Sequence, residues 1–397
     1  MANGISQYCR ILFLYLSYHI SHNNKYKYSN KKIHKLLFKN NIHLILERHL
    51  SAGAGMIAHD FLTAMGTLPA DQHKVVAIAG KDLDRLNISL VVPDIVFVSV
   101  INLQHYEIAK LMLDNGKHVL CEKPMGMSWK QTKSLIDLAR EKKLFLLEGM
   151  WSRFFPAYDA LNQHIASGGL GDIYHINIQF GVEINDIERN LMKDMGGGAV
   201  LDLGVYMLQL VQFIYDEPPT DMVCTGHLST SGVDESMSCA LKYKNGKTAA
   251  LTAHTRANMT NKAEIIGTKG SISLDYFWCP TVLQISAANN TEWTLPKGKY
   301  KFHFHNSAGL SYEIQECWEC INKGMYRGRV QNHRDLLCEN GPPRLVKYHE
   351  LSEYRCKLAH AEFNSVRVKL SNPSLSHFKG RQRTCNIICV ASVHGQR

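Results

Sequence analysis

The sequence predicts an α/β protein in which an N-terminal Rossmann-type, doubly wound parallel sheet precedes a C-terminal α+β domain with a large, mostly antiparallel open sheet. Three observations predict this fold. Residues 53–58 form a G-x-G-x-x-A turn. Apolar runs of strand length then alternate with helical patterns up to about residue 150. After residue 170, strand-like segments follow one another through short polar turns.

The first of these domains is predicted over residues 51–150. A helix follows the glycine turn and ends near Leu68. Glu47, Arg48 and His49 interrupt the apolar stretch before the turn, which makes a poor strand. Four apolar runs without polar alternation indicate strands buried on both faces, at 74–80, 94–102, 117–124 and 144–150. Helical patterns lie between them at 105–116 and 128–143.

The second domain is predicted over residues 151–325. One long apolar helix is expected at 199–215 and a shorter one after residue 310. Turns such as Lys-Asn-Gly and Thr-Lys-Gly join neighbouring segments and indicate hairpins. Strands are expected at 173–182, 236–243, 247–255, 262–267 and 270–275.

The two ends of the chain differ from its body in charge. The whole chain of 397 residues carries a net charge of +10. Residues 1–50 hold eight basic and one acidic residue, and residues 326–397 hold thirteen and five, which leaves a mildly acidic body. We therefore predict basic extensions at 1–50 and 326–397, and no nucleic-acid partner unless those ends bind one.

Other bulk features bear on the compartment. No stretch approaches the roughly 18 consecutive apolar residues that a membrane helix needs, so no membrane association is expected. The apolar run 11–20 lacks the basic start and the small-residue cleavage site of a secretory signal. Eleven scattered cysteines are typical of a reducing compartment. We expect a cytoplasmic protein.

The glycine turn indicates a dinucleotide site. Gly53 permits the tight turn, Gly55 lets the backbone approach a pyrophosphate, and the following helix directs its N-terminus at the phosphates. We predict that Gly53, Gly55, Met56 and Ile57 contact the cofactor.

The end of the next strand bears on which nicotinamide cofactor binds. An NAD site places an acidic residue there for the ribose hydroxyls. In this chain Gly80 or Lys81 stands at about that position, and Lys81 and Arg85 can bind a 2′-phosphate. The sequence therefore favours NADP, while Asp82 one place further on keeps NAD open.

Lys123 is the foremost candidate for chemistry. It lies at the carboxyl end of a predicted parallel strand, where open α/β sheets bind ligands. Pro124 restricts its backbone to an extended form and permits a cis bond, and Glu122 precedes it. An ammonium group held there can donate a proton to a substrate oxygen or polarise it.

Asp202 and Tyr206 are four residues apart on the predicted helix and share one face. A phenol beside an ammonium group can have its pKa lowered and act as an acid or a base. We predict Lys123, Tyr206 and Asp202 as the catalytic group. The alternative for Tyr206 is a core residue with a satisfied hydroxyl.

Aromatic residues near the domain junction are candidates for the substrate pocket. Trp151, Phe154 and Phe155 surround Arg153 in the sequence and can line a pocket or pack the domains together. No metal site is predicted, because no carboxylate or cysteine accompanies His303 and His305 at ligand spacing.

Taken in order, these motifs resemble the glucose–fructose oxidoreductase/inositol dehydrogenase/rhizopine catabolism (Gfo/Idh/MocA) family. The resemblance spans about residues 52–86 and 91–325. It rests on Gly53-x-Gly55, Asn102 with His105, Glu122-Lys123-Pro124, Trp151-x-Arg153-Phe154-Phe155, Asp202-x-Gly204-x-Tyr206, Gly267-Thr268-Lys269-Gly270, Trp278-Cys279-Pro280-Thr281 and Ala308-Gly309-Leu310-Ser311-Tyr312-Glu313.

The resemblance implies hydride transfer between NADP and an alcohol carbon of a small diol or sugar. Lys123 would sit beside the reacting carbon, Tyr206 would be the acid or base, and Asp202 would orient them. It also implies a homodimer formed through the C-terminal sheet. Cofactor contacts would further include Asn102, His105, Glu122 and Lys123, and the pocket would be lined by Trp151, Arg153, Phe180, Trp278 and Phe304.

Three departures from the family pattern keep alternatives open. About fifty residues precede the glycine turn, and some 25–30 residues of a strand–helix unit are missing between Leu86 and Val91. The match also fades after Met325, where the expected closing helix and strand are not recognisable. A parallel crossover needs about a dozen residues or more, which the remaining segment barely provides. The alternatives are another sugar or keto-sugar oxidoreductase of the same family and a catalytically impaired form that acts as a binding protein.

Overall fold

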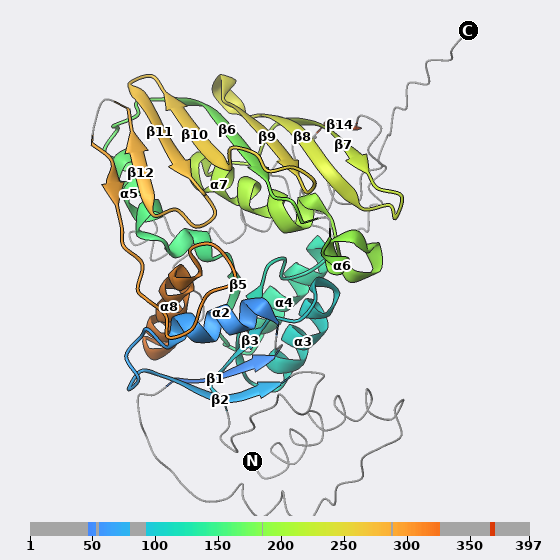
Figure 1. Cartoon of the computed structure of the whole chain (residues 1–397), viewed down its shortest axis with the longest axis vertical. Helices are drawn as coiled ribbons and strands as arrows, with labels where there is room; N and C mark the ends of the chain where they lie inside the picture. The colour runs from blue at the N-terminus through green and yellow to red at the C-terminus, as the bar shows by residue number, and fades with distance from the viewer. Residues whose placement is uncertain are drawn as a thin grey trace, which may run out of the picture.

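The structure is a computed structural model that describes residues 47–52, 55–79, 93–184, 186–286, 289–325 and 366–369. It contains a five-stranded sheet and a nine-stranded sheet, one above the other in Figure 1. Helices cover the smaller sheet, and α5 and α7 lie along the inner face of the larger one (Figure 1). The predicted fold class is confirmed.

The five-stranded sheet is parallel throughout, with the order β2-β1-β3-β4-β5. All four residues of β3 are buried, as expected for a strand covered on both faces. Its elements are β1 (Glu47–Ala52), α2 (Met56–Met65), β2 (His73–Ala79), β3 (Ile95–Val98), α3 (Asn102–Asp114), β4 (His118–Glu122), α4 (Trp129–Glu141) and β5 (Leu146–Gly149).

Strand β1 contains the charged residues that make this stretch a poor strand in the sequence. The charged residues Glu47 and Arg48, expected to interrupt a strand, open it. The backbone of β1 pairs with β2 on one side and with β3 on the other, so ladder hydrogen bonds hold it from both edges. Pairing on both sides overrides the weak apolar pattern, and the first sheet therefore starts at residue 47 rather than 51.

Strand β2 stands at the edge of this sheet. From β2 the chain returns past β1 to enter β3, and residues 80–92 of that connection lie outside the described residues. The strand–helix unit that the sequence lacks relative to the family pattern would extend the sheet beyond β2, where the described part of the chain has no further strand.

The nine-stranded sheet has the order β13-β12-β11-β10-β6-β9-β8-β7-β14. Every pair in it is antiparallel except β6 with β9. Its strands are β6 (Ile173–Gly181), β7 (Asp221–Leu228), β8 (Asp234–Lys242), β9 (Thr248–His254), β10 (Lys262–Gly267), β11 (Gly270–Asp275), β12 (Val282–Ile285), β13 (Thr291–Glu292) and β14 (Val366–Lys369).

Four of these strands, β7 and β12–β14, are not predicted by the sequence. In β7 the buried alternation stops after Met222 and Cys224, and Gly226 follows, so the apolar period of two is too short to recognise. Strand β14 lies in the basic C-terminal segment and pairs its backbone with β7. Part of the segment after residue 325 therefore belongs to the sheet.

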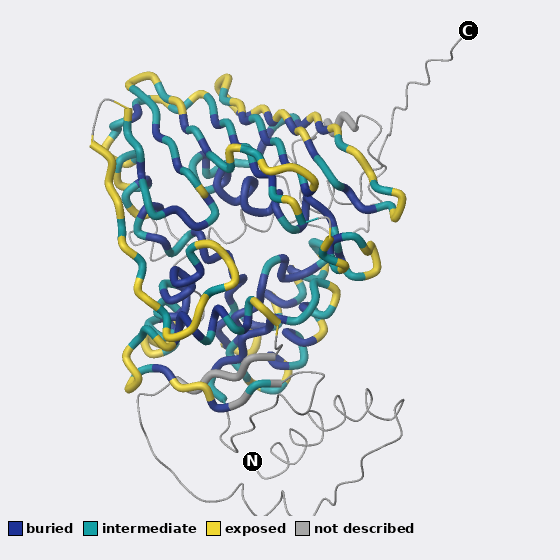
Figure 2. The backbone as a smooth tube through the Cα atoms, in the orientation of Figure 1, coloured by how far each residue is buried: buried dark blue, intermediate teal, exposed yellow. Residues whose placement is uncertain are grey.

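The predicted apolar helix 199–215 is confirmed as a π-helical turn, Val200–Gly204, that leads into α7 (Val205–Tyr215). The helical run Lys193–Tyr215 is long and apolar enough to cross a membrane by length and composition. Most of it is buried in the protein, however, as in the core helices of many proteins (dark blue in Figure 2).

One hydrophobic core spans both sheets. It joins Phe61 of α2 and Phe97 of β3 to residues of α7 and of the larger sheet. Two further helices complete it: α5 (Pro156–Ala166), and α8 (Leu310–Asn322), which returns to pack on α2. Figure 2 shows this buried interior between the elements. The shared core fixes the C-terminal lobe against the cofactor-type lobe.

The cysteines differ in part from the expectation of reduced thiols. Cys317 and Cys320 are buried thiols on α8, as packed helix residues. Cys224 of β7 and Cys239 of β8 face each other across the antiparallel pair and form a disulfide.

Candidate functional site

The site is centred on the ammonium group of Lys123, at the carboxyl end of β4. A cis peptide bond joins Lys123 to Pro124, as the sequence permits. The Nζ atom donates to Asp202 Oδ1 at 2.7 Å and to the Asp202 backbone oxygen at 2.9 Å. Only 13% of each side chain is exposed. The structure thus brings the first domain and the π-helical turn of the second together at one ion pair.

Asp202 is held by two cations. Arg189 of the short helix α6 (Glu188–Leu191) places Nη2 3.6 Å from Asp202 Oδ2, on the side away from Lys123. Burial acts to raise the pKa of Asp202, but Lys123 and Arg189 outweigh it and lower the pKa from 3.8 to about 2. Asp202 is therefore a fixed anion at neutral pH. The sequence does not indicate Arg189, because no regular spacing relates it to Asp202.

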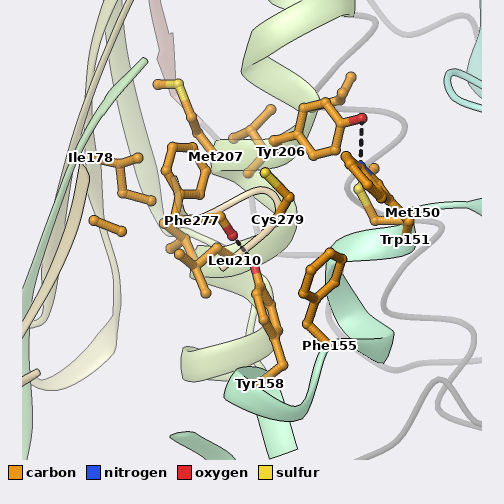
Figure 3. Packing of buried hydrophobic residues seen from close by; sticks show 14 of the residues in the cluster. Met150, Trp151, Phe155, Tyr158, Ile178, Tyr206, Met207, Leu210, Phe277 and Cys279 are labelled. Carbon is orange, nitrogen blue, oxygen red and sulfur yellow. Dashed lines mark hydrogen bonds between the residues drawn. The ribbon is translucent and has the colours of Figure 1, made fainter. Parts of the chain in front are cut away.

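Tyr206 lies one helical turn after Asp202, on the same face. The Lys123 Nζ atom is 5.0 Å from the centroid of its ring. The Trp151 indole Nε1 donates to the Tyr206 hydroxyl at 3.1 Å (Figure 3). The site therefore combines an ammonium group, a phenol and an indole within a largely buried space.

The sequence-based expectation of a lowered pKa for Tyr206 is wrong. Burial raises the pKa of this phenol well above 10, and the carboxylates of Glu122 and Asp202 add to the shift, while the bond from Trp151 opposes it. Tyr206 is consequently a protonated phenol at neutral pH and is suited to donate a proton.

Two further carboxyl groups lie beneath this site. Burial raises the pKa of Glu122 from 4.5 to about 7, and Lys123 and its backbone N–H act against the shift. Glu313 of α8 is fully buried, and neither of its oxygens has a hydrogen-bond partner among the described residues. Burial and the nearby Glu122 raise its pKa well above 4.5. In the sequence, Glu313 belongs to the Ala308–Glu313 family motif, and no pattern predicts a role for it.

The described part of the glycine turn is open to a ligand. Gly55 precedes α2 with no side-chain cap, so the first N–H groups of this ten-residue helix are available. A Cβ atom at Gly55 would meet nothing within 4 Å, and Met56 is 49% exposed. Ile57 instead packs against the core. Gly53, Lys81 and Arg85 lie outside the described residues.

Asn102 and His105 stand at the start of α3, beside the same edge of the sheet. Asn102 donates its amide to the Gly196 oxygen at 2.9 Å. The buried His105 ring lies between the Pro124 oxygen, 2.8 Å from Nδ1, and the Val100 oxygen, 2.9 Å from Nε2. His105 thus ties the ends of β3 and β4 together, and its contact with a cofactor stays a prediction.

Aromatic rings lie beside Tyr206 in this site. Phe180 of β6 stacks on Trp278, with ring centroids 4.0 Å apart and an angle of 18°, and lies 6.1 Å from the Tyr206 ring. Phe304 is 39% exposed on the segment that crosses α2. Apolar rings so arranged can pack on the flat face of an aromatic diol or of a sugar.

Arg153 is directed away from these rings. Its guanidinium donates to Gln209 Oε1 at 3.0 Å and to the Gln209 backbone oxygen at 3.2 Å, and it lies over the Phe213 ring of α7. These contacts fix the domain junction to α7. Packing the domains together is the alternative to a pocket role that the sequence leaves open for this cluster. Contact between Arg153 and a substrate stays a prediction.

The residues present fit a dinucleotide. The open turn at Gly55, the uncapped N-terminus of α2 and the carboxyl ends of β1, β3 and β4 meet at one edge, between the strands where the order reverses. Lys123 and the phenol of Tyr206 stand beside that edge. The arrangement can bind a nicotinamide nucleotide and move a proton to or from a substrate oxygen.

Comparisons with known proteins agree with this geometry. Residues 48–150 match the model "Oxidoreductase family, NAD-binding Rossmann fold", and residues 158–273 match "GFO/IDH/MocA C-terminal domain". The trans-1,2-dihydrobenzene-1,2-diol dehydrogenase of Xenopus tropicalis is 35% identical over 302 residues, which cover 71% of this chain and 91% of that protein. Its human counterpart is 33% identical over 296 residues, covering 70% and 88%.

Solved structures share the fold at lower identity. A levoglucosan dehydrogenase in complex with NADH and levoglucosan aligns with a TM-score of 0.65 and 18% identity, over 82% of this chain and all of that one. KijD10, a 3-ketoreductase from Actinomadura kijaniata in complex with NADP, aligns with a TM-score of 0.61 and 22% identity, over 79% and 95%. Both bind a nicotinamide cofactor, and they differ in which one.

Proposed function

Because the chain belongs to the GFO/IDH/MocA oxidoreductase family, we propose that it is an NADP-dependent dehydrogenase acting on a small trans-dihydrodiol or on an aldose such as D-xylose. It would oxidise a CH–OH group. One observation carries the proposal: Lys123, fixed by Asp202, lies 5.0 Å from the Tyr206 ring, which lies 6.1 Å from Phe180 of the Phe180–Trp278 stack. The relatives at 33–35% identity that carry a dihydrodiol dehydrogenase name support the substrate class.

The chain's own residues act on the substrate oxygen. A nicotinamide nucleotide held at the Gly55 turn would supply the hydride acceptor for oxidation and the hydride donor for reduction. Lys123 polarises the substrate oxygen. The ionised form of Tyr206 takes the substrate proton in oxidation, and its protonated form donates one in reduction. Since the pKa of Tyr206 is raised in the free protein, the proton-donating form prevails at neutral pH. We therefore expect oxidation to accelerate with rising pH more than reduction does.

The preference for NADP rests on Lys81 and Arg85, both beyond the described residues. Their charges would pair with a 2′-phosphate at the end of β2. Lys81→Ala should raise the KM for NADP about tenfold or more while the KM for NAD changes little, in line with the loss of a charge-assisted contact. Equal KM values for NADP and NAD in the unchanged protein would contradict the preference.

A panel of substrates tests the reaction. The purified full chain should reduce NADP with a trans-dihydrodiol or D-xylose, and both rates should fall together in Lys123→Met. Turnover only with a keto-sugar and NADPH would favour another oxidoreductase activity of the family. Cofactor binding without turnover on any of these would favour a catalytically impaired binding protein, which the unmatched segment around residues 86–91 makes the second candidate.

We also propose a cytoplasmic homodimer joined through the outer face of the nine-stranded sheet, with no nucleic-acid or membrane partner. On that sheet Tyr174, Val223 and Ile266 are 46%, 44% and 41% exposed, while α5 and α7 cover its other face (Figure 1). Light scattering should give twice the chain mass, and Val223→Lys should lower it. Salt-sensitive DNA binding or vesicle binding at physiological salt would contradict the partner assignment.

A further inference from the structure

A second cluster of polar side chains lies apart from Lys123, where the segment 293–306 crosses α2. We name this segment the strap. Gly298 of the strap packs so closely on α2 that a Cβ atom there would meet Thr63 Cγ2 at 2.7 Å. Asp60 of α2 is fully buried beneath it and binds its backbone. The strap carries Phe304, so this junction joins the cofactor-type helix to the predicted substrate pocket.

Asp60 is held rigidly by backbone donors. Oδ1 accepts from the His303 N–H at 2.9 Å, and Oδ2 accepts from the N–H groups of His303 and Phe304 at 3.0 and 2.9 Å. Each carboxylate oxygen has two lone pairs. The second lone pair of Oδ1 is not used by these backbone donors, and His59 Nδ1 lies 3.2 Å from this oxygen.

Two imidazoles converge on this carboxylate. The rings of His59 and His303 meet edge to face with centroids 4.7 Å apart. One ligand atom from each of His59, Asp60 and His303 lies within 4.8 Å of the others. The sequence predicts no metal here, since no carboxylate is near His303 in the chain. Folding brings Asp60 to it across some 240 residues.

We infer that His59, Asp60 and His303 form a binding site for a divalent transition cation such as Zn²⁺, which clamps the strap to α2. Bonds of about 2.0–2.1 Å to nitrogen and oxygen in a tetrahedral site separate two ligand atoms by about 3.3 Å. The 3.2 Å between His59 Nδ1 and Asp60 Oδ1 already matches that edge. A rotation of the exposed His303 brings in the third ligand.

The chemistry of the three donors selects the kind of cation. Two neutral imidazoles and one carboxylate suit Zn²⁺, Co²⁺ or Ni²⁺ rather than Ca²⁺ or Mg²⁺, which prefer oxygen ligands. The backbone N–H groups on Asp60 supply the outer contacts that orient a ligating carboxylate. Lys297, Lys299 and Lys301 also lie on the strap, but all are solvent-accessible and their repulsion is screened.

Titration of the untagged full chain with Zn²⁺ tests the site. Calorimetry should show one ion per chain that His303→Ala weakens by at least about tenfold, the lower limit for losing even an outer contact of a metal ligand. His59→Ala should act in the same direction. His305→Ala is the matched control on the same strap, since its ring instead faces Tyr276 at 4.3 Å, and it should bind as the unchanged protein does.

A second readout follows the clamp itself. Zn²⁺ should raise the Tm of the unchanged protein and of His305→Ala but not of His303→Ala. Equal Zn²⁺ affinity in all variants, or no stoichiometric binding in the unchanged protein, would overturn the inference. Neither measurement depends on dehydrogenase activity, so the outcome is independent of the proposed function.

Discussion

The two sheets supply functional groups in different ways. In the parallel sheet, Lys123 stands at a strand end, at the edge where all strands of such a sheet finish. In the C-terminal lobe, Asp202 and Tyr206 come from a π-helical turn and the helix after it, which cover the larger sheet. Topology places the ammonium group, whereas helical register places its two partners. The site therefore depends on how tightly α7 is held against the end of β4.

The largest expected effect comes from the helical side. Tyr206→Phe removes only the hydroxyl, and kcat should fall about 10²–10⁴-fold, the usual contribution of one proton-transfer group. Tyr215→Phe is the matched control at the far end of α7, where the hydroxyl donates to the Thr248 oxygen at 2.8 Å. It should leave kcat unchanged. Steady-state kinetics of both variants check this, and a Tyr206→Phe enzyme with nearly normal kcat would assign Tyr206 to the core alone.

The next effect concerns Glu122 at the end of β4, which should make the stability of the protein depend on pH. Folded Glu122, with its pKa raised to about 7, retains a proton that the unfolded chain releases near pH 4.5. The folded state thus binds more protons between these values, so stability should fall as pH rises from 4.5 to 7, by about 3 kcal/mol at 1.36 kcal/mol per pKa unit.

Glu122→Gln removes that titration while keeping an oxygen for the Lys123 N–H, which donates to Glu122 at 3.2 Å. Urea unfolding at pH 4.5, 6 and 8 should show a flatter profile in the variant and greater stability than the parent at pH 8. Parallel profiles would show that Glu122 ionises normally in the fold.

The ion pair that joins the two sides gives the third effect. Asp202→Asn keeps the shape but frees Lys123 from its 2.7 Å partner, and kcat/KM should fall by up to about 10²-fold, as for a misplaced catalytic group. Because the pKa of Asp202 is lowered to about 2, its stabilising charge is complete above pH 4 and is lost as pH falls toward 2. The Asp202→Asn variant should lack this loss of stability in acid. An unchanged kcat/KM would show that the ion pair does not contribute to catalysis.

Trp278→Leu should produce the smallest change. A stacked aromatic pair contributes about 0.5–1.5 kcal/mol, so the KM for an aromatic diol should rise about 2–10-fold with kcat nearly unchanged. Tyr300→Leu, on the strap and 58% exposed, is the control. A fall in kcat without a change in KM would place Trp278 in the chemistry rather than in the pocket wall.

The contrast between the lobes also explains what the sequence can predict. Lys123 can be predicted as a site residue because the carboxyl ends of parallel strands lie at the edge of the sheet where ligands bind. Asp202 and Tyr206 can be predicted because residues four apart lie on the same face of a helix. Arg189 and Asp60 act through contacts that no spacing encodes. The pKa of Tyr206 is predicted in the wrong direction, because only the fold shows that its phenol is buried and lies near Glu122. The apolar pattern of β1 is too weak to predict this strand, since β1 is held by its pairing with β2 and β3, which lie further along the chain.

The central claim is that Lys123 and Tyr206 act as one unit across the two lobes. A double-mutant cycle with Lys123→Met, Tyr206→Phe and the combined variant measures it most directly through kcat for a dihydrodiol or D-xylose. The double variant should lose about as much kcat as the more damaged single variant, as groups acting as a unit do. Losses that multiply, or full activity in either single variant, would contradict it.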